Sequence, residues 1–197
     1  MAEQVKMATN MAIRGAIDAM VEIMGKNGTE VLFRNAGLVK VFQNPPEYNF
    51  EPCIPTTEQI KFYMNIVDVM GLNGAISLWR RIAYTIMQYA NERGNMLASF
   101  DALPEIEKFH KGLEIFTLIS GKGTPVLKEG QPDELSVPDC FMCLEYKNKL
   151  KRSMCAVHEG AIQYLADWSF GKGKYLSRET QCMGKGDPVC YFALEKK

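Results

Sequence analysis

Five of the six cysteines in this chain of 197 residues lie in its C-terminal third, and their spacing limits the fold more than any other feature. The last two, Cys182 and Cys190, flank the stretch MGKGDPV, whose residues favour turns. We therefore predict a hairpin of residues 174–180 and 189–194, with the two cysteines at facing strand ends. Disulfides are rare in a reducing cytosol, so metal binding, redox chemistry and simple burial are the alternatives.

The residues around this turn include a carboxylate as well as thiols. Zinc needs about four ligands in a tetrahedral array, and Cys thiolates with one carboxylate meet that need. Glu179 lies three residues before Cys182, so on a regular strand the two side chains face opposite ways. Glu179 reaches the same ion only if the strand ends or bulges near Gln181. The spacing fits a metal site and two buried free thiols about equally well.

A second cysteine pair lies upstream. Cys140 and Cys143 have the C-x-x-C spacing, which is typical of zinc sites, iron–sulfur clusters and thiol redox centres. Attachment of haem c is excluded because Leu144, and not His, follows the second cysteine. Cys155 and His158 are three residues apart on a predicted helix, so both could approach one metal ion, although a lone helical histidine is more often a core or surface residue.

Two stretches of the N-terminal half share one pattern, VEIMGKNGTEVLFR at residues 21–34 and VDVMGLNGAISLWR at 67–80. Each contains an MGxNG turn and closes on an aromatic residue followed by Arg. We predict that a first helix ends near Gly25 and that the next starts at Thr29. The repeat indicates a helix-turn-helix unit used twice, forming two packed helical hairpins. Similar turns that require similar residues, without duplication, are the alternative.

The expected elements change in kind along the chain. Residues 42–59 are rich in proline, contain the isolated Cys53, to which we give no role, and exclude a regular helix until Thr57 or Glu58. Further helices are predicted at 74–89, 103–120 and 154–168, with short strands between the last two. We predict an α+β fold in which helical hairpins pack on a small antiparallel sheet. The chain is expected to form a single domain, 1–197, with a mainly helical half, 1–120, and a mixed metal-binding half, 121–197.

Charge and hydropathy exclude several kinds of partner. The chain has 23 basic and 23 acidic residues, and neither sign forms a long block. A nucleic acid or an anionic lipid surface is therefore not expected to bind it. The N-terminus lacks a signal-peptide pattern, and no apolar stretch approaches the ~20 residues of a membrane span. We expect a cytoplasmic protein.

The segment CAVHEGAIQYLADWSFGKGKYLSRETQCMGKGDPVCYF resembles the C-terminal signature of the 4-vinyl reductase domain family, which has a Cys, a helix of small residues, and then E-x-x-C and G-x-x-x-C on a closing hairpin. The stretches MAIRGAIDAMVEIMGKNGTEVLFRNAGL, NPPEYNF and YTIMQYA are similar to longer prokaryotic members. This resemblance implies a ligand-binding fold related to haem-binding nitric-oxide sensors and to small subunits of the TRAPP trafficking complex.

The resemblance also implies a ligand set for a metal. In aromatic-responsive transcription activators, a domain of this family holds zinc through a Cys, a Glu and two further Cys. These ligands fall on Cys155, Glu179, Cys182 and Cys190 of this chain. The additional Cys140 and Cys143 depart from that pattern, so an iron–sulfur cluster is the alternative cofactor.

The leading hypothesis for function is a sensor domain that encloses a hydrophobic small molecule, such as an aromatic compound or a tetrapyrrole. Twelve methionines and 18 Phe or Tyr residues supply adaptable apolar lining. Four aromatic residues are candidates for contact with the ligand: Phe62, Trp79, Tyr84 and Trp168. A sensor output then requires a partner protein, and the apolar repeated hairpins favour a homodimer.

Two other hypotheses belong to different classes. The family name points to an accessory enzyme in the reduction of a tetrapyrrole vinyl group, and the C-x-x-C pair points to redox chemistry. Hydride transfer needs a nicotinamide or flavin site, yet no G-x-G-x-x-G follows a predicted strand, and no nucleophile motif is present. The sequence thus favours binding over catalysis. The trafficking relatives offer the third hypothesis, a non-catalytic assembly subunit.

Overall fold

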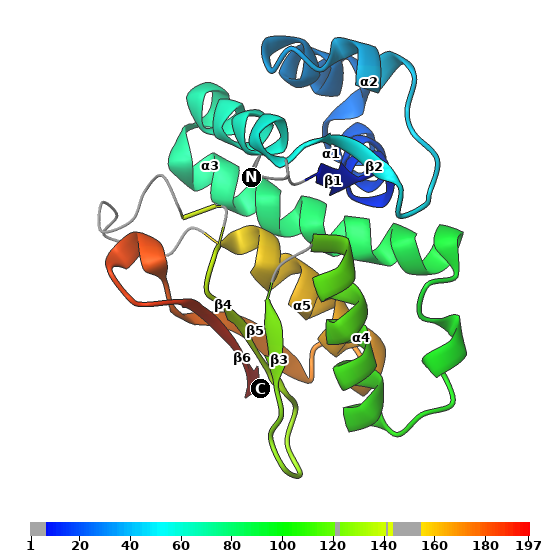
Figure 1. The fold of residues 1–197 in the computed structure, drawn as a ribbon, viewed down its shortest axis with the longest axis vertical. Helices are drawn as coiled ribbons and strands as arrows, with labels where there is room; N and C mark the ends of the chain where they lie inside the picture. Colours follow the sequence, from blue (N-terminus) through cyan, green and yellow to red (C-terminus); the bar gives the residue numbers. More distant parts are fainter. Residues whose placement is uncertain (1–6, 121–122, 141, 144–154) are drawn as a thin grey trace, which may run out of the picture.

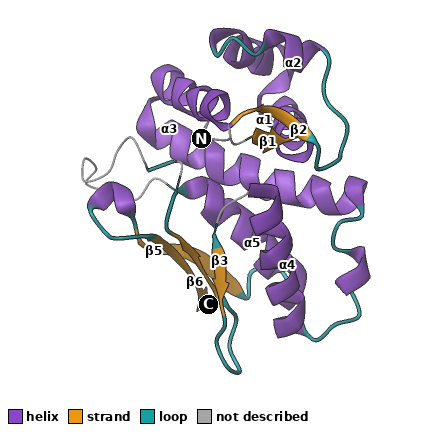
Figure 2. Cartoon of the chain, viewed as in Figure 1, coloured by secondary structure: helices purple, strands orange, loops and turns teal. Residues whose placement is uncertain are grey.

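The protein has an α+β fold, as the sequence predicts (Figures 1 and 2). The computed structural model describes residues 7–120, 123–140, 142–143 and 155–197. Its helices are α1 (Asn10–Asn35), α2 (Val39–Gln43), α3 (Thr56–Gly94), α4 (Glu105–Ser120) and α5 (Ala156–Phe170). Its strands are β1 (Met7–Thr9), β2 (Pro52–Pro55), β3 (Thr124–Val126), β4 (Glu134–Val137), β5 (Tyr175–Gln181) and β6 (Cys190–Lys196). Two short 3₁₀ helices cover Ala98–Phe100 and Met183–Lys185.

The main sheet has the antiparallel order β3-β4-β6-β5. Strands β5 and β6 form the predicted hairpin, and β4 pairs with β6 so that Val137 lies opposite Cys190. Helix α5 packs against β5 and β6, and α4 packs beside α5 (Figure 1). A second sheet, β1 with β2, was not predicted, because two prolines in a four-residue stretch weaken any strand signal.

Helices α1 and α3 are each bent at one glycine. Gly25 has φ 78° and ψ 166°, and Gly71 has φ 69° and ψ 164°, a left-handed region that favours glycine. The helix resumes directly after each glycine, and Gly28 is helical. The predicted turn of several residues at each MGxNG repeat is therefore wrong in length, since one residue with positive φ is enough to redirect a helix. The repeat itself recurs in the structure as two bends of the same geometry.

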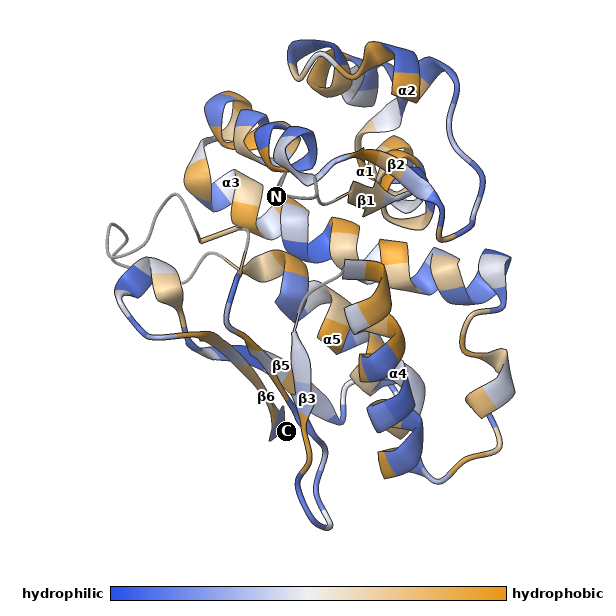
Figure 3. Ribbon diagram, in the orientation of Figure 1, coloured by the Kyte–Doolittle hydropathy of each residue, from blue (hydrophilic) through white to orange (hydrophobic). Residues whose placement is uncertain are grey.

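The core lies where α3 crosses α5 and α1. Apolar bands recur along α3 and α4 in Figure 3, as expected for helices that bury one face. Trp79 on α3 is fully buried. At the crossing of α3 and α5, Gly160 lies against the backbone of Arg80, and a side chain at this position would overlap the Arg80 carbonyl oxygen. Among the described residues, no helix combines the length and apolar character that crossing a membrane requires.

We predict that Gly160→Ala destabilises the protein by at least about 2 kcal/mol, because the new methyl group forces α3 and α5 apart. The matched control is Gly28→Ala, where the added Cβ meets only Met24 at ordinary distances of 3.5–3.6 Å. Removing a glycine from a helix interior there should stabilise the protein by about 0.5–1 kcal/mol. Urea unfolding of both variants measures the difference, and equal stabilities would contradict the close crossing.

Candidate metal centre

Four separate segments deliver cysteines to one buried point. Cys182 directly follows β5, and Cys190 is the first residue of β6, so the predicted hairpin does bring them together. Cys143 follows β4 through a turn in which its backbone N–H donates to the Cys140 carbonyl at 2.9 Å. Cys155 caps the N-terminus of α5. These five cysteines, Cys140 included, have 0–1% of their surface exposed.

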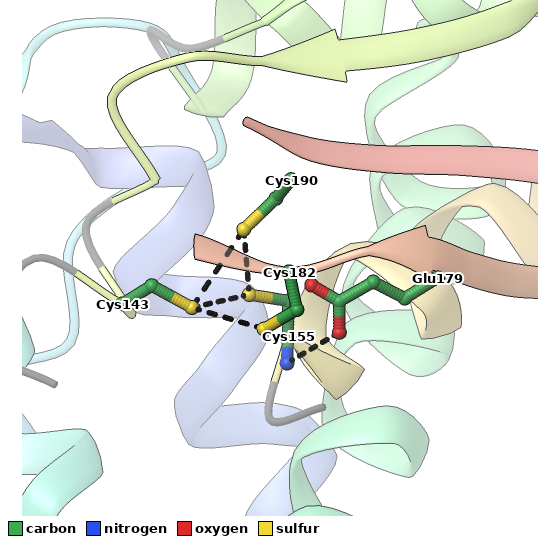
Figure 4. A group of neighbouring side chains, drawn as sticks. All are labelled: Cys143, Cys155, Glu179, Cys182 and Cys190. Atoms are coloured by element: carbon green, nitrogen blue, oxygen red, sulfur yellow. Dashed lines mark hydrogen bonds between the residues drawn. The ribbon is translucent and has the colours of Figure 1, made fainter. Parts of the chain in front are cut away.

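The sulfur atoms of this group point toward one another (Figure 4). Cys143 Sγ lies 3.1 Å from Cys155 Sγ, 3.6 Å from Cys182 Sγ and 3.7 Å from Cys190 Sγ. The Cys155 and Cys190 sulfurs are 3.5 Å apart. These cysteines are free thiols in the structure. A tetrahedral ion with Zn–S bonds of about 2.3 Å holds its sulfur ligands about 3.8 Å apart, so the observed separations fit one ion after small shifts.

The carboxylate of Glu179 completes the group. The pairing of β5 with β6 is irregular between Glu179 and Gln181, which is the bulge that the sequence argument required. Glu179 Oε2 accepts a hydrogen bond from the Cys155 backbone N–H at 3.3 Å, while Oε1 is buried and has no hydrogen-bond partner among the residues that the structure describes. One ligand atom from each of Cys143, Cys155, Glu179, Cys182 and Cys190 lies within 4.8 Å of all the others. A buried carboxylate oxygen without a partner fits a cation at this point.

Glu159 on α5 holds Glu179 in place, and sequence reasoning missed it. Its Oε1 accepts a hydrogen bond from the Glu179 backbone N–H at 2.8 Å, and its Oε2 accepts one from the Arg80 guanidinium of α3. Only 8% of Glu159 is exposed. The sequence signal was weak, because one glutamate in the stretch HEGA looks like an ordinary polar position on a helix. Glu159 therefore joins α3, α5 and β5 beside the thiols.

The electrostatics of the group favour a bound cation. Burial, and after it the adjacent Cys182, raise the pKa of Glu179 to about 8. Hydrogen bonds from Cys140, then from its other thiol neighbours, hold the pKa of Cys143 well below its usual range. Cys155 and Cys190 also interact with Cys140, and in these two residues the interaction raises the pKa of the thiol. A divalent cation would favour all the ionised forms at once and resolve this competition for protons.

A polar surface hollow lies beside the centre. Its volume is about 510 Å³, and Cys155 and Glu179 are among the residues that line it. Arg80, Glu159 and Arg178 line it too. Any proposed metal site requires an entry path, and for this centre the path would start from the hollow.

A small cavity lies on the other side of the start of α5. Its volume is about 60 Å³, and it is walled by β1 and helices α1, α3, α4 and α5. The lining is mostly apolar with a few polar groups: Met7, Ala8, Ala12, Thr56, Gln59, Tyr63, Ala83, Ile86, Met87, Phe116, Ile119, Ser120, Val157, His158 and Ala161. Three alanines on three helices leave the space open. Alanines at helix positions that face the core are the signal by which the sequence could have revealed this cavity.

The four predicted ligand-contacting aromatics do not line this cavity. Phe62 packs on Phe33 with ring centroids 4.5 Å apart, and Trp79 meets the edge of Tyr63 at 6.3 Å. The Tyr84 hydroxyl and the Trp168 indole N–H bind surface carboxylates, those of Asp167 at 3.2 Å and Asp101 at 3.1 Å. Phe62 and Tyr84 are sequence neighbours of the lining residues Tyr63 and Ala83. Helical geometry turns adjacent side chains about 100° apart, so Phe62 and Tyr84 face away from the cavity that their neighbours line, and their contact with a ligand stays a prediction.

His158 lies between the cavity and the thiols. It is fully buried, stacks on Phe192 at a centroid distance of 5.2 Å, and meets the edge of Phe116 at 5.8 Å. Donor atoms of Cys140, Cys155 and His158 lie within 4.8 Å of one another. The predicted shared face of Cys155 and His158 is thus present in the structure.

The fold is shared with solved sensor domains, although no family model and no curated protein sequence matches the chain. The phenol-responsive sensory domain of the transcription activator PoxR, solved with phenol, is 16% identical, with TM-score 0.56 over 83% of this chain and 90% of that one. An H-NOX protein from S. oneidensis in the Fe(II)NO state is 14% identical, with TM-score 0.57 over 96% and 99%. An oxygen-binding H-NOX domain related to soluble guanylate cyclases is 14% identical, with TM-score 0.55 over 91% and 89%.

These structures define the class of fold. The chain has the α+β fold of H-NOX domains and of a phenol-sensing domain, which is the sensor-type fold that the sequence predicted. Membership of the 4-vinyl reductase domain family stays a prediction. At identities of 13–16%, the likeness concerns the backbone arrangement, and the chemistry must be argued from this chain's own residues.

We predict that replacing Cys182 or Cys190 with Ser removes one equivalent of zinc per chain, the ion bound by this group. It should also lower the free energy of unfolding by at least about 3 kcal/mol, because metal binding is coupled to folding. That loss corresponds to roughly 6–12 °C in Tm for a chain of this size. Elemental analysis and thermal melting with and without a chelator provide the measurements.

The matched control is Cys53→Ser, since Cys53 is half-buried and lies outside the group. Its zinc content and Tm should stay close to those of the unmodified protein. A hairpin variant that keeps the full zinc content and the full Tm of the unmodified protein would contradict the assignment.

Proposed function

We propose that this protein is a sensor domain that binds a small, mainly apolar molecule in the cavity between α3, α4 and α5, with a thiolate-bound zinc ion bracing the adjacent wall. The observation that carries the proposal is the cavity itself: a partly open, mainly apolar space that shares the first turn of α5 with the thiol group. Pockets of this kind, apolar with a few polar groups, are the usual form of small-molecule sites.

The size of the cavity narrows the class of ligand. Its volume of about 60 Å³ compares with about 150 Å³ for an apolar cavity that takes up benzene. Sites for drug-sized ligands are about 300–1,000 Å³. A single aromatic ring therefore fits after movement of flexible side chains such as Met7 and Met87, both of which line the cavity. A tetrapyrrole would need a much larger rearrangement, so we favour the aromatic compound among the predicted ligands.

The distances between sulfur atoms support a single ion over an iron–sulfur cluster. A cluster places several irons between its thiolates and spreads them further apart than one ion does. The separations of 3.1–3.7 Å are closer to the tetrahedron of one metal. Zinc accepts this mixture of thiolates with a carboxylate, and it needs no redox partner.

A panel of ligands tests the binding proposal. We expect phenol or toluene, at about 100 times its Kd, to stabilise the protein by about 2.7 kcal/mol, or roughly 5–10 °C in Tm. Ala83→Leu should abolish this shift, because it fills the cavity. The matched control is Ala90→Leu on the same helix, which is equally buried but does not line the cavity, and which should keep the shift.

Other outcomes of the panel separate the alternatives. A shift with porphyrin and none with single rings would contradict the small-ligand proposal and favour a haem sensor. Absence of any shift would favour the assembly-subunit hypothesis. Steady turnover of a vinyl tetrapyrrole with NAD(P)H by the protein alone would overturn the binding-only function.

We also propose that the sensor is a homodimer that passes its signal to a partner protein. Val31, Val69 and Met70, three exposed apolar side chains on the repeated segments of α1 and α3, support an interface in the helical half. Light scattering should give twice the chain mass, and Val69→Lys with Met70→Lys should halve it. A monomer mass at all concentrations for the unmodified protein would refute the dimer.

A further inference from the structure

The thiol group has more donor atoms than one tetrahedral ion can use. Cys143, Cys155, Glu179, Cys182 and Cys190 form one set of mutually close donors, and Cys140, Cys155 and His158 form another. Cys155 belongs to both sets. A structural zinc site takes four ligands, so one ion leaves Cys140 and His158 without a function.

The second set is arranged as a site in its own right. Cys140 Sγ lies 3.1 Å from Cys155 Sγ. His158 is one helical turn after Cys155, which turns both side chains to the same side of α5. Phe192 stacks on the His158 ring and Phe116 meets its edge, so aromatic packing fixes the plane of the ring. All three donors have 0–1% of their surface exposed.

We propose that Cys140, Cys155 and His158 bind a second divalent cation of the zinc type, and that the Cys155 thiolate bridges it to the first. Two thiolates and an imidazole are ligands of the softness that zinc and cobalt(II) accept. A thiolate sulfur has lone pairs enough for two such ions. With the bridging Cys155, the thiolates of Cys143, Cys182 and Cys190 give the first ion its four tetrahedral ligands, and the Glu179 carboxylate lies within 4.8 Å of them.

The second ion differs from the first in having only three protein ligands among the described residues. Zinc sites with three protein ligands keep a fourth position for water or substrate. His158 lines the small cavity, so the second ion lies beside it. A donor atom of the bound molecule, such as a phenolate oxygen or a thiolate, therefore completes the coordination. This last step rests on the proposed ligand-binding function, and the two-ion centre does not.

Metal titration of the metal-free protein tests the second site. We expect two equivalents of zinc or cobalt(II) per chain, with the thiolate-to-cobalt absorption rising over both equivalents. Cys140→Ser and His158→Ala should each bind one equivalent and keep the first ion. His158→Cys should restore two, because a thiolate replaces the imidazole. Cys53→Ser should bind two equivalents throughout.

Several results would overturn the second site. The unmodified protein would bind only one equivalent of metal, or His158→Ala would bind two. Binding of one equivalent by His158→Cys would also overturn it, when circular dichroism shows that this variant is folded. Failure of the proposed function gives a different pattern, with two ions bound but no shift in Tm across the aromatic panel. A single ion with a normal aromatic shift would refute the second site alone.

Azide tests the open coordination position. Added to the protein loaded with two cobalt(II) ions, it should shift the visible d–d bands, and the shift should be absent from His158→Ala loaded with its single equivalent. A shift of the same size in that variant would place the open position on the first ion and contradict the assignment.

Discussion

The convergence of five thiols at the start of α5 is the constraint on which the C-terminal half depends. Strands β3 and β4 have only three and four residues, and such short strands give a sheet little stability of their own. The cysteines bring the segment after β4, the first turn of α5 and both sides of the β5–β6 turn to one buried point. The metal ion proposed above would add a long-range connection that the backbone ladder provides only in part, and folding would then be coupled to metal binding.

The crossing of α3 and α5 connects this centre to the cavity. Because Gly160 has no side chain, the backbones of α3 and α5 approach closely at Arg80. The neighbouring Glu159 is therefore near enough to accept a hydrogen bond from the Arg80 guanidinium. In the same turn His158 lines the cavity, and one turn before Glu159 lies Cys155 of the thiol group. Helix α5 therefore carries the cavity lining and the thiol group on the same few residues, which links the two proposed sites mechanically.

Much of this organisation was predictable from sequence because local signals and tertiary packing agree. The turn MGKGDPV predicts the hairpin. The sequence argument also required a bulge near Gln181 if Glu179 is to reach Cys182, and the structure has a strand irregularity there. The helical bends were located correctly at Gly25 and Gly71 but read as longer turns, since sequence gives the glycine and not its φ. The strands β1 and β2 and the cavity lining escaped prediction. Both arise from contacts between distant segments, and a helical pattern of aromatics does not say which face meets an empty space.

The bends in α1 and α3 have a consequence for motion. A residue with positive φ interrupts the helical hydrogen-bond ladder, so residues 26–35 and 56–70 are coupled only weakly to the rest of their helices. These outer segments pack on each other through Phe33 and Phe62. We expect these two segments to open together, at a lower free energy than global unfolding. Thr56, Gln59 and Tyr63 of these segments form one wall of the cavity. Such an opening would expose this wall of the cavity, and a molecule bound there, as proposed above, would then enter and leave at the rate of a local unfolding event.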